Sequence, residues 1–235
     1  TSVAEAREMQ AAADANGVVL MEAFMYRFHP RTVRLLELAK PETIGDLRMI
    51  RSSFVVKLAS ATNIRFYPEL GGGALRDLGC YCIDVSRRIA GAEPVEVQAF
   101  ASWNDRGVDV AMTATLRFPN DVAAQFDCSF LMERREFVEA AGLAASVSSP
   151  AETFVNSVDT VEILERRNLL ADVHHPVQGD DHYRLMVEHF ADAVIGKTPP
   201  SYGITDSLGN LVVIEALYAS ARAGGRPMPV ERLEV

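Results

Sequence analysis

Three consecutive glycines, residues 71 to 73, precede a helix-like run that carries a carboxylate and a phenol, Asp77 and Tyr81. Their spacing of four residues puts both side chains on one face of an α-helix, about one turn apart. A carboxylate and a phenol can orient a hydroxyl group and move a proton. Glycines let a ligand or another backbone come close, and a helix N-terminus favours negative charge nearby. The sequence therefore predicts a proton-handling site on a helix that begins near Ala74.

The same helix has an apolar face that must pack against the rest of the fold. The residues at three- and four-residue spacing that form this face are Leu75, Leu78, Cys82, Val85 and Ile89. Asp84 and Arg88 continue the polar face, and we expect them to be solvated because charged helical residues usually face water. A phosphate-binding loop is excluded, because Ala74, Leu75 and Arg76 stand where that motif requires Lys and then Ser or Thr.

The elements that must position this helix are predicted from apolar periodicity and turn residues. A buried strand is expected at residues 18–22, and helices at 2–17, 31–40, 181–196 and 206–223. Period-two alternation predicts further strands at 44–57, 95–103, 110–118, 122–130, 136–148 and 158–166. Residues 168–180 and 196–203 have the composition of linkers. Short turns between successive strands indicate an α+β (α/β) fold, a large, mainly antiparallel, open β-sheet with helices packed on one face.

Composition restricts the partners and the compartment. The chain has 235 residues, of which 49% are hydrophobic, so it can bury a full core. Its net charge of −9 argues against nucleic acid, and no apolar run is long enough to cross a membrane. Three cysteines, Cys80, Cys82 and Cys128, are an odd number for a disulfide framework and favour free thiols in a reducing compartment. We therefore expect a cytoplasmic protein.

Two other functions stay open at this stage. The stretch from His174 to His182 contains His and Asp residues suited to a divalent metal, as in a metal-dependent hydrolase. Its spacing forms no regular ligand pair, so a polar loop leading into a helix is the expectation and no metal ligand is assigned. A sheet domain of this kind could also be a non-catalytic module for dimerisation or interaction.

Four segments together resemble a known family, and they span nearly the whole chain. They are "MEAFMYRFHP", "GDLRMIRSSF", "PELGGGALRDLGCYCIDVSRRIAG" and "SLGNLVVIEALYASARAGGRPMPV". They are similar to the glucose-fructose oxidoreductase/inositol dehydrogenase (Gfo/Idh/MocA) family, and most similar to its dihydrodiol and D-xylose dehydrogenase branch. The resemblance implies an N-terminal Rossmann domain, with a glycine fingerprint and a Glu-Lys-Pro motif, before an α/β domain with an open antiparallel sheet. Neither motif occurs here, so we expect residues 1–23 to be a helix-strand remnant of the Rossmann domain and residues 24–235 the substrate-binding and oligomerisation domain.

The resemblance also implies a reaction and a set of site residues. Hydride would pass between NAD(P) and a carbinol carbon of a sugar or diol, with NADP as the favoured cofactor. Tyr81 would act as general acid/base, and Asp77 would orient either Tyr81 or the substrate. A phenol with a reference pKa of about 10 needs a nearby cation to act as a base, and the family's lysine for this role would lie outside the chain. The truncated chain is expected to be inactive alone and to form a homodimer or larger homo-oligomer through the sheet.

Further residues match pocket or cofactor positions of the family, each with a structural alternative. Phe54 and Arg65 would line the substrate pocket, or would be a core aromatic and a salt-bridge partner. Tyr183 is a further pocket candidate. Arg27 would face the cofactor cleft or cap a helix.

Overall fold

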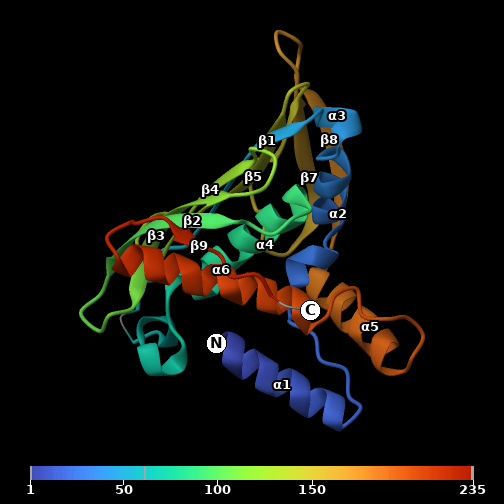
Figure 1. Cartoon of the computed structure of the whole chain (residues 1–235). Helices are drawn as coiled ribbons and strands as arrows, with labels where there is room; N and C mark the ends of the chain where they lie inside the picture. Colours follow the sequence, from blue (N-terminus) through green and yellow to red (C-terminus); the bar gives the residue numbers. More distant parts are fainter. Residues whose placement is uncertain (1, 61, 234–235) are drawn as a thin grey trace.

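One large sheet, backed by helices, dominates the computed structural model, which describes residues 2–60 and 62–233 (Figure 1). The strands are β1 (Leu47–Val55), β2 (Glu96–Trp103), β3 (Asp109–Arg117), β4 (Ala123–Ser129), β5 (Arg135–Gly142), β6 (Ser146–Ser149), β7 (Ser157–Arg166), β8 (Val173–Asp180) and β9 (Met228–Pro229). The helices are α1 (Val3–Ala15), α2 (Pro30–Leu38), α3 (Pro41–Ile44), α4 (Cys80–Ala90), α5 (His182–Val194) and α6 (Ile204–Arg222).

The strand order in the sheet is β8-β7-β6-β5-β1-β4-β3-β2-β9. β1 pairs in parallel with β4, with Phe54 opposite Cys128, and every other described pair is antiparallel. The meander results from the short turns between successive strands, whereas the parallel pair needs the long crossover through α4. The predicted class, a mainly antiparallel open sheet with helices on one face, is confirmed.

The core lies between the sheet and its helices. α4 packs on β1 and β4, α6 packs on β2, and α2 packs on β6, β7 and β8. Apolar residues of α4 and of the turn before it, such as Leu75, Ile83 and Val85, are fully buried on this side. The opposite face of the central strands carries no helix among the described residues, as Figure 1 shows. α1 lies beside α6, where the Val3 amide donates to Glu215 Oε1 at 3.0 Å.

The strand predicted at residues 18–22 is wrong. These residues have no strand partner, and Val18 is 60% exposed. An apolar run becomes a strand only where a neighbour completes its backbone hydrogen bonds, and here the run connects α1 to a 3₁₀ turn at Met25–Phe28.

Two further sequence predictions need correction. The single strand expected at 136–148 is two strands, β5 and β6, because the chain reverses between Gly142 and Ser146. Part of the linker expected at 168–180 is β8, an edge strand that pairs with β7 along seven register positions. Pro176 is tolerated there because an edge strand needs donors on one side only.

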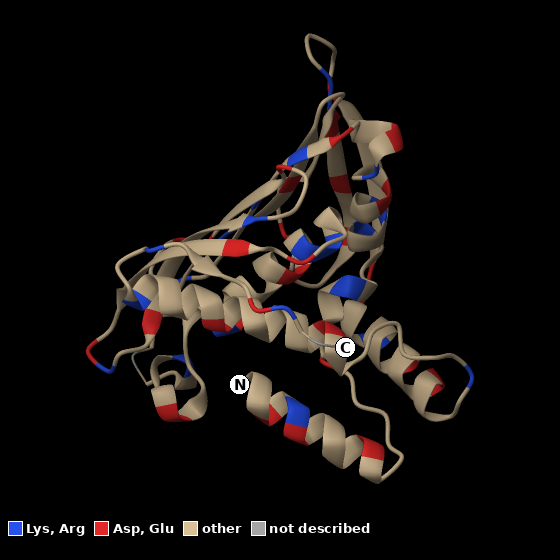
Figure 2. Ribbon diagram, in the orientation of Figure 1, with Lys and Arg blue, Asp and Glu red and all other residues tan. Residues whose placement is uncertain are grey.

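The acidic excess is not gathered on one element. Acidic and basic residues alternate over the helices and strands in Figure 2. Among the helices described between residues 2 and 233, none is both long enough and apolar enough to cross a bilayer.

Candidate functional site

The turn of three glycines folds back onto the chain just before it. The amides of Gly72 and Gly73 donate to the backbone oxygens of residues 67 and 65, at 3.0 and 3.1 Å. Gly73 has a φ of +135°, and a Cβ there would collide with the Asp109 carboxylate and the Tyr218 hydroxyl. The close approach predicted at these glycines is therefore made by the protein's own backbone and side chains.

Asp77 lies in a π-helical turn, Leu75–Gly79, which replaces the expected start of a regular helix near Ala74. Its Oδ2 accepts a hydrogen bond from Arg65 Nε at 2.6 Å, in a pair whose side chains are 29% and 40% exposed. A hollow of about 160 Å³ opens beside this pair, lined by Ile64, Arg65, Leu70, Gly71, Gly72, Arg76 and Asp77. The pairing of Arg65 with Asp77 matches its salt-bridge alternative, and the hollow leaves its pocket role open.

The Tyr81 side chain is partly buried among other aromatic rings. Four rings approach its own with centroid distances of 5.2 to 5.8 Å: Phe24, Tyr26, Phe54 and Phe154. Its hydroxyl lies 3.5 Å from Met25 Sδ. The structure thus brings Phe54, which is buried and stacked on Phe154, together with Tyr81.

Burial raises the pKa of Tyr81 above its usual value, and nearby acidic groups, including Asp77, raise it further. The phenol is therefore protonated at neutral pH. In this state it can donate a proton to a developing alkoxide, whereas accepting one would require a cation beside it.

Arg27, in the 3₁₀ turn Met25–Phe28, is buried beside the middle of α4. Its guanidinium pairs with Asp84 and Asp206 and stacks on the Tyr202 ring at 3.9 Å. Tyr26 also donates to Asp84, whose side chain is 0% exposed. The expectation that Asp84 is solvated is therefore wrong, because its carboxylate is buried and pairs with the Arg27 guanidinium instead of water. A cofactor contact for Arg27 stays a prediction.

Tyr183 is half exposed at the start of α5, where its ring packs against His182. It contributes to the raised pKa of Tyr81 but has no described ring contact with it.

The histidines of the possible metal cluster do not converge. His174 bonds to Glu162 at 2.8 Å, and His175 bonds to Glu165 at 3.0 Å. His182 is buried beside His29. Within residues 2–60 and 62–233, no group of three or more His, Cys, Asp or Glu side chains is placed to hold a metal ion.

Comparison with known proteins assigns this arrangement to a family. Residues 32–148 match the family model described as the GFO/IDH/MocA C-terminal domain. The chain belongs to the GFO/IDH/MocA family. This match covers the glycine turn, the π-helical turn, Tyr81 and the strands β1 to β5.

Relatives within the GFO/IDH/MocA family include two kinds of dehydrogenase. The chain is 30% identical to D-xylose 1-dehydrogenase (NADP(+)) 2 of Haloferax volcanii over 211 residues, which are 88% of this chain and 64% of that protein. It is 39% identical to trans-1,2-dihydrobenzene-1,2-diol dehydrogenase of Mus musculus over 129 residues, which are 54% of this chain and 38% of that protein. The chain thus spans less than two thirds of the length of these relatives.

Solved structures confirm the fold. An aldose-aldose oxidoreductase from Caulobacter crescentus, complexed with glycerol, superposes with a TM-score of 0.87 at 24% identity, over 97% of this chain and 69% of that one. A 3-ketoreductase from Actinomadura kijaniata, in complex with NADP and TDP-benzene, gives 0.87 at 25% identity, over 94% and 68%.

Several residues around this GFO/IDH/MocA site were missed from sequence. Phe154 reaches Tyr81 from the loop before β7, and Asp206 reaches Arg27 from α6. Asp109 accepts from the Leu75 amide, just after the glycine turn, and from the Tyr218 hydroxyl. Each lies more than 30 residues from its partner, and neither periodicity nor motif spacing carries information about such contacts.

Proposed function

We propose that this chain is the substrate-binding and proton-transfer part of an NAD(P)-dependent oxidoreductase that acts on a sugar or diol carbinol. Residues 24–235 would form that domain and residues 1–23 a remnant of a dinucleotide-binding domain. The observation that carries the proposal is the position of Tyr81, a protonated phenol in an aromatic surround on the same helical segment as the Asp77–Arg65 pair. The names of the relatives support a dehydrogenase acting on sugars or diols.

Tyr81 would transfer the proton. In the direction of ketone reduction, its Oη–H bond breaks as an O–H bond forms on the substrate oxygen, leaving a phenolate. The phenol is protonated at neutral pH, which is the state that this direction requires, although its raised pKa makes the phenolate left behind costly to form. In the direction of oxidation, a cation near Oη would have to stabilise the phenolate first, as the family resemblance implies for a lysine outside the chain.

A polyhydroxyl substrate would fit the hollow beside the Asp77–Arg65 pair, on the same helical segment as Tyr81. Arg65 offers guanidinium donors and Asp77 offers carboxylate acceptors, so the pair can bind two neighbouring hydroxyls of a sugar or diol. The Phe54 ring would cover the apolar side of the same ligand, and Tyr183, half exposed on α5, would complete the pocket.

The described residues do not fit a dinucleotide. Gly71 to Gly73 follow 3₁₀ turns rather than a strand, and their amides are bonded to the backbone of residues 65 to 68. NAD(P), with NADP favoured by the relatives' names, would therefore be held mainly by residues outside this chain, with Arg27 as the one cofactor contact proposed within it. We expect the isolated chain to leave NADPH fluorescence unchanged and to be inactive. The buried free cysteines support our placing it in the cytoplasm.

Tyr81→Phe in the full-length protein tests the proposal. Loss of the proton donor should lower kcat for sugar or diol turnover by about 10²- to 10⁴-fold, with KM nearly unchanged. Tyr67→Phe is the matched control, because the Tyr67 ring stacks under Arg106 at 4.2 Å and removing its hydroxyl keeps that contact. Undiminished turnover in Tyr81→Phe would refute the role of the phenol.

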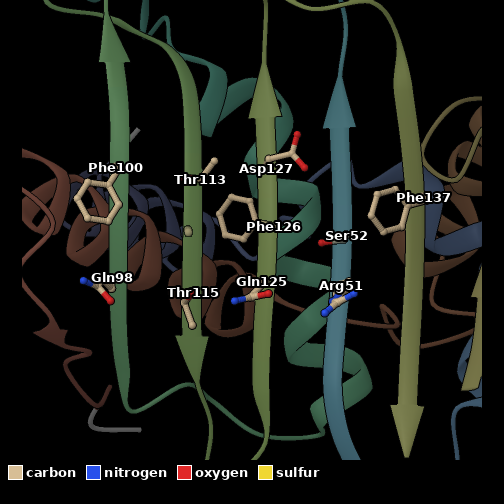
Figure 3. Close-up of a pocket in the computed structure, with 11 residues that line it drawn as sticks. Arg51, Ser52, Gln98, Phe100, Thr113, Thr115, Gln125, Phe126, Asp127 and Phe137 are labelled. Atoms are coloured by element: carbon tan, nitrogen blue, oxygen red, sulfur yellow. The ribbon is translucent and has the colours of Figure 1, made fainter.

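The open face of the sheet supports a second part of the proposal, a homodimer. Figure 3 shows this face, where Phe100, Thr113, Asp127 and Phe137 lie in one row on β2, β3, β4 and β5, with β1 between β4 and β5. Phe100 is 57% exposed, and the residues enclose a hollow of about 390 Å³. A second copy of the chain could pack the same row of residues against this one, which would bury the phenylalanine rings of both copies.

Phe100→Asp tests this dimer. A charge buried in the interface should convert the dimer to monomer in sedimentation velocity, because the carboxylate would have no partner there. Val33→Asp, at an exposed apolar residue of α2, is the control and should leave the sedimentation coefficient unchanged. A wild-type chain that sediments as a monomer would refute the dimer.

A further inference from the structure

The π-helical turn Leu75–Gly79 needs support from outside its own helix. The Cys80 amide donates to Leu75 O, five residues back, so the turn holds one residue more than an α-helical turn. Such turns are rare, and their usual sites are functional ones. Tyr81 comes two residues after this turn and Asp77 lies within it, so the turn determines the direction of both side chains.

A buried carboxylate holds the first residue of the turn. Asp109, at the start of β3, is 1% exposed. Its Oδ2 accepts from the Leu75 amide at 2.7 Å, and its Oδ1 accepts from the Tyr218 hydroxyl at 2.7 Å. Gly73 leaves the space that these two side chains occupy, since a Cβ there would lie 2.7 Å from the Tyr218 oxygen.

A second contact holds the other end of the turn. Asn210 Nδ2 donates to Cys80 O at 3.1 Å, within the buried surface between α6 and α4. Asn210 and Tyr218 are both on α6, and eight residues at 1.5 Å each separate them by about 12 Å along the helix axis. One rigid helix therefore contacts both ends of the turn, directly at Cys80 and through Asp109 at Leu75.

We propose that Asp109, Tyr218 and Asn210 are positioning residues that maintain the π-helical turn and thereby aim Asp77 and Tyr81 into the substrate site, an inference that rests on the proposed function. They touch neither the Tyr81 hydroxyl nor the Asp77 carboxylate, so they act through the backbone. Without them the segment would relax toward a regular α-helix. An α-helical turn contains one residue fewer than the π-helical turn. This change of one residue would rotate α4 by about 100° relative to the glycine turn.

Fluorine NMR of the 235-residue chain labelled with 3-fluorotyrosine tests this inference. The Tyr81 signal is assigned by its loss in Tyr81→Phe. Asp109→Asn and Tyr218→Phe change little side-chain volume, and in both we expect the Tyr81 signal to shift or split. The amides of residues 75–81 should exchange with solvent about five- to tenfold faster, because a hydrogen bond is lost.

Ser220→Ala is the matched control. Ser220 is also buried on α6, where its hydroxyl bonds to Arg226 O and accepts from the Ala99 amide, away from the turn. It should lower the melting temperature without moving the Tyr81 signal. If Asp109→Asn and Tyr218→Phe behave like Ser220→Ala, with only a lower melting temperature, the positioning role is wrong.

Turnover of the full-length protein separates this inference from the proposed function. We expect Tyr218→Phe to lower kcat about tenfold, because a partly misaimed Tyr81 loses part of its acid/base contribution, with KM little changed. If Tyr81→Phe abolishes turnover but Tyr218→Phe keeps the full kcat, the positioning role alone is wrong. Full kcat in Tyr81→Phe would instead overturn the proposed function.

Discussion

One helical segment, Leu75–Ala90, contributes the acidic members of two acid–base pairs with opposite surroundings. At its start, Asp77 and Arg65 are 29% and 40% exposed beside a hollow. In the middle of α4, Asp84 pairs with Arg27 of the 3₁₀ turn Met25–Phe28; their side chains are 0% and 4% exposed, and Asp206, Tyr26 and Tyr202 pack around them. The exposed pair can exchange partners with a ligand, whereas the sealed pair ties the segment before α2 to α4 and α6. Burial, rather than residue type, separates the candidate site from the scaffold.

Asp84→Asn and Asp77→Asn should therefore differ most in stability. Asp84→Asn leaves the Arg27 cation buried without its main counter-charge, which should cost about 3–5 kcal/mol of the free energy of unfolding. Asp77→Asn breaks a half-exposed pair and should cost about 1 kcal/mol or less. Urea unfolding followed by circular dichroism measures both. Similar losses in the two variants would contradict the distinction between a sealed and an exposed pair.

A second sealed group, His182, predicts a smaller effect that depends on pH. Burial, with smaller contributions from His29 and Arg31 and against the opposing charge of Asp181, lowers the pKa of His182 to about 4. An unfolded histidine titrates near 6.5, so the unfolded chain binds the proton more readily. Stability is then complete above pH 6.5 and falls as the pH drops toward 4, by about 3 kcal/mol for this group.

His182→Phe should remove most of this loss, because the ring space is filled without a titrating group. Unfolding free energies at pH 7 and pH 4.5 measure the effect, and Tyr183→Phe, a change on the next residue of α5, is the control. A variant with the same pH dependence as the parent would show that other groups cause the acid sensitivity. His29, whose pKa burial also lowers, would account for a residual slope.

Local signals predicted most of the fold. Helices at 31–40, 181–196 and 206–223 were found within about two residues of α2, α5 and α6, because apolar spacing and caps such as Asp181 are local. β8 was missed because Pro176, Gly179 and exposed polar residues resemble a loop, and only its pairing with β7 makes it a strand. The strand at 18–22 failed for the opposite reason, since its apolar run has no partner among the described residues.

The site was predicted in part. The glycine turn, Asp77 and Tyr81 were correctly placed on one helical segment, and the structure brings Arg65 and Phe54 beside them. The π-helical turn could not be predicted, because it depends on Asp109 and α6, which are distant in sequence. Asp84 was placed in water because the sequence does not show that Arg27 and Asp206 meet it.

The most direct test of the central claim is to locate a bound sugar on the ¹⁵N-labelled chain. We expect millimolar D-xylose to shift the amide signals of residues 65, 71–77 and 81 in a saturable manner. Asp77→Asn should weaken these shifts while the fold is retained. Saturable shifts confined to the open sheet face, or shifts at the site that Asp77→Asn leaves unchanged, would contradict a substrate site formed by Asp77, Arg65 and Tyr81.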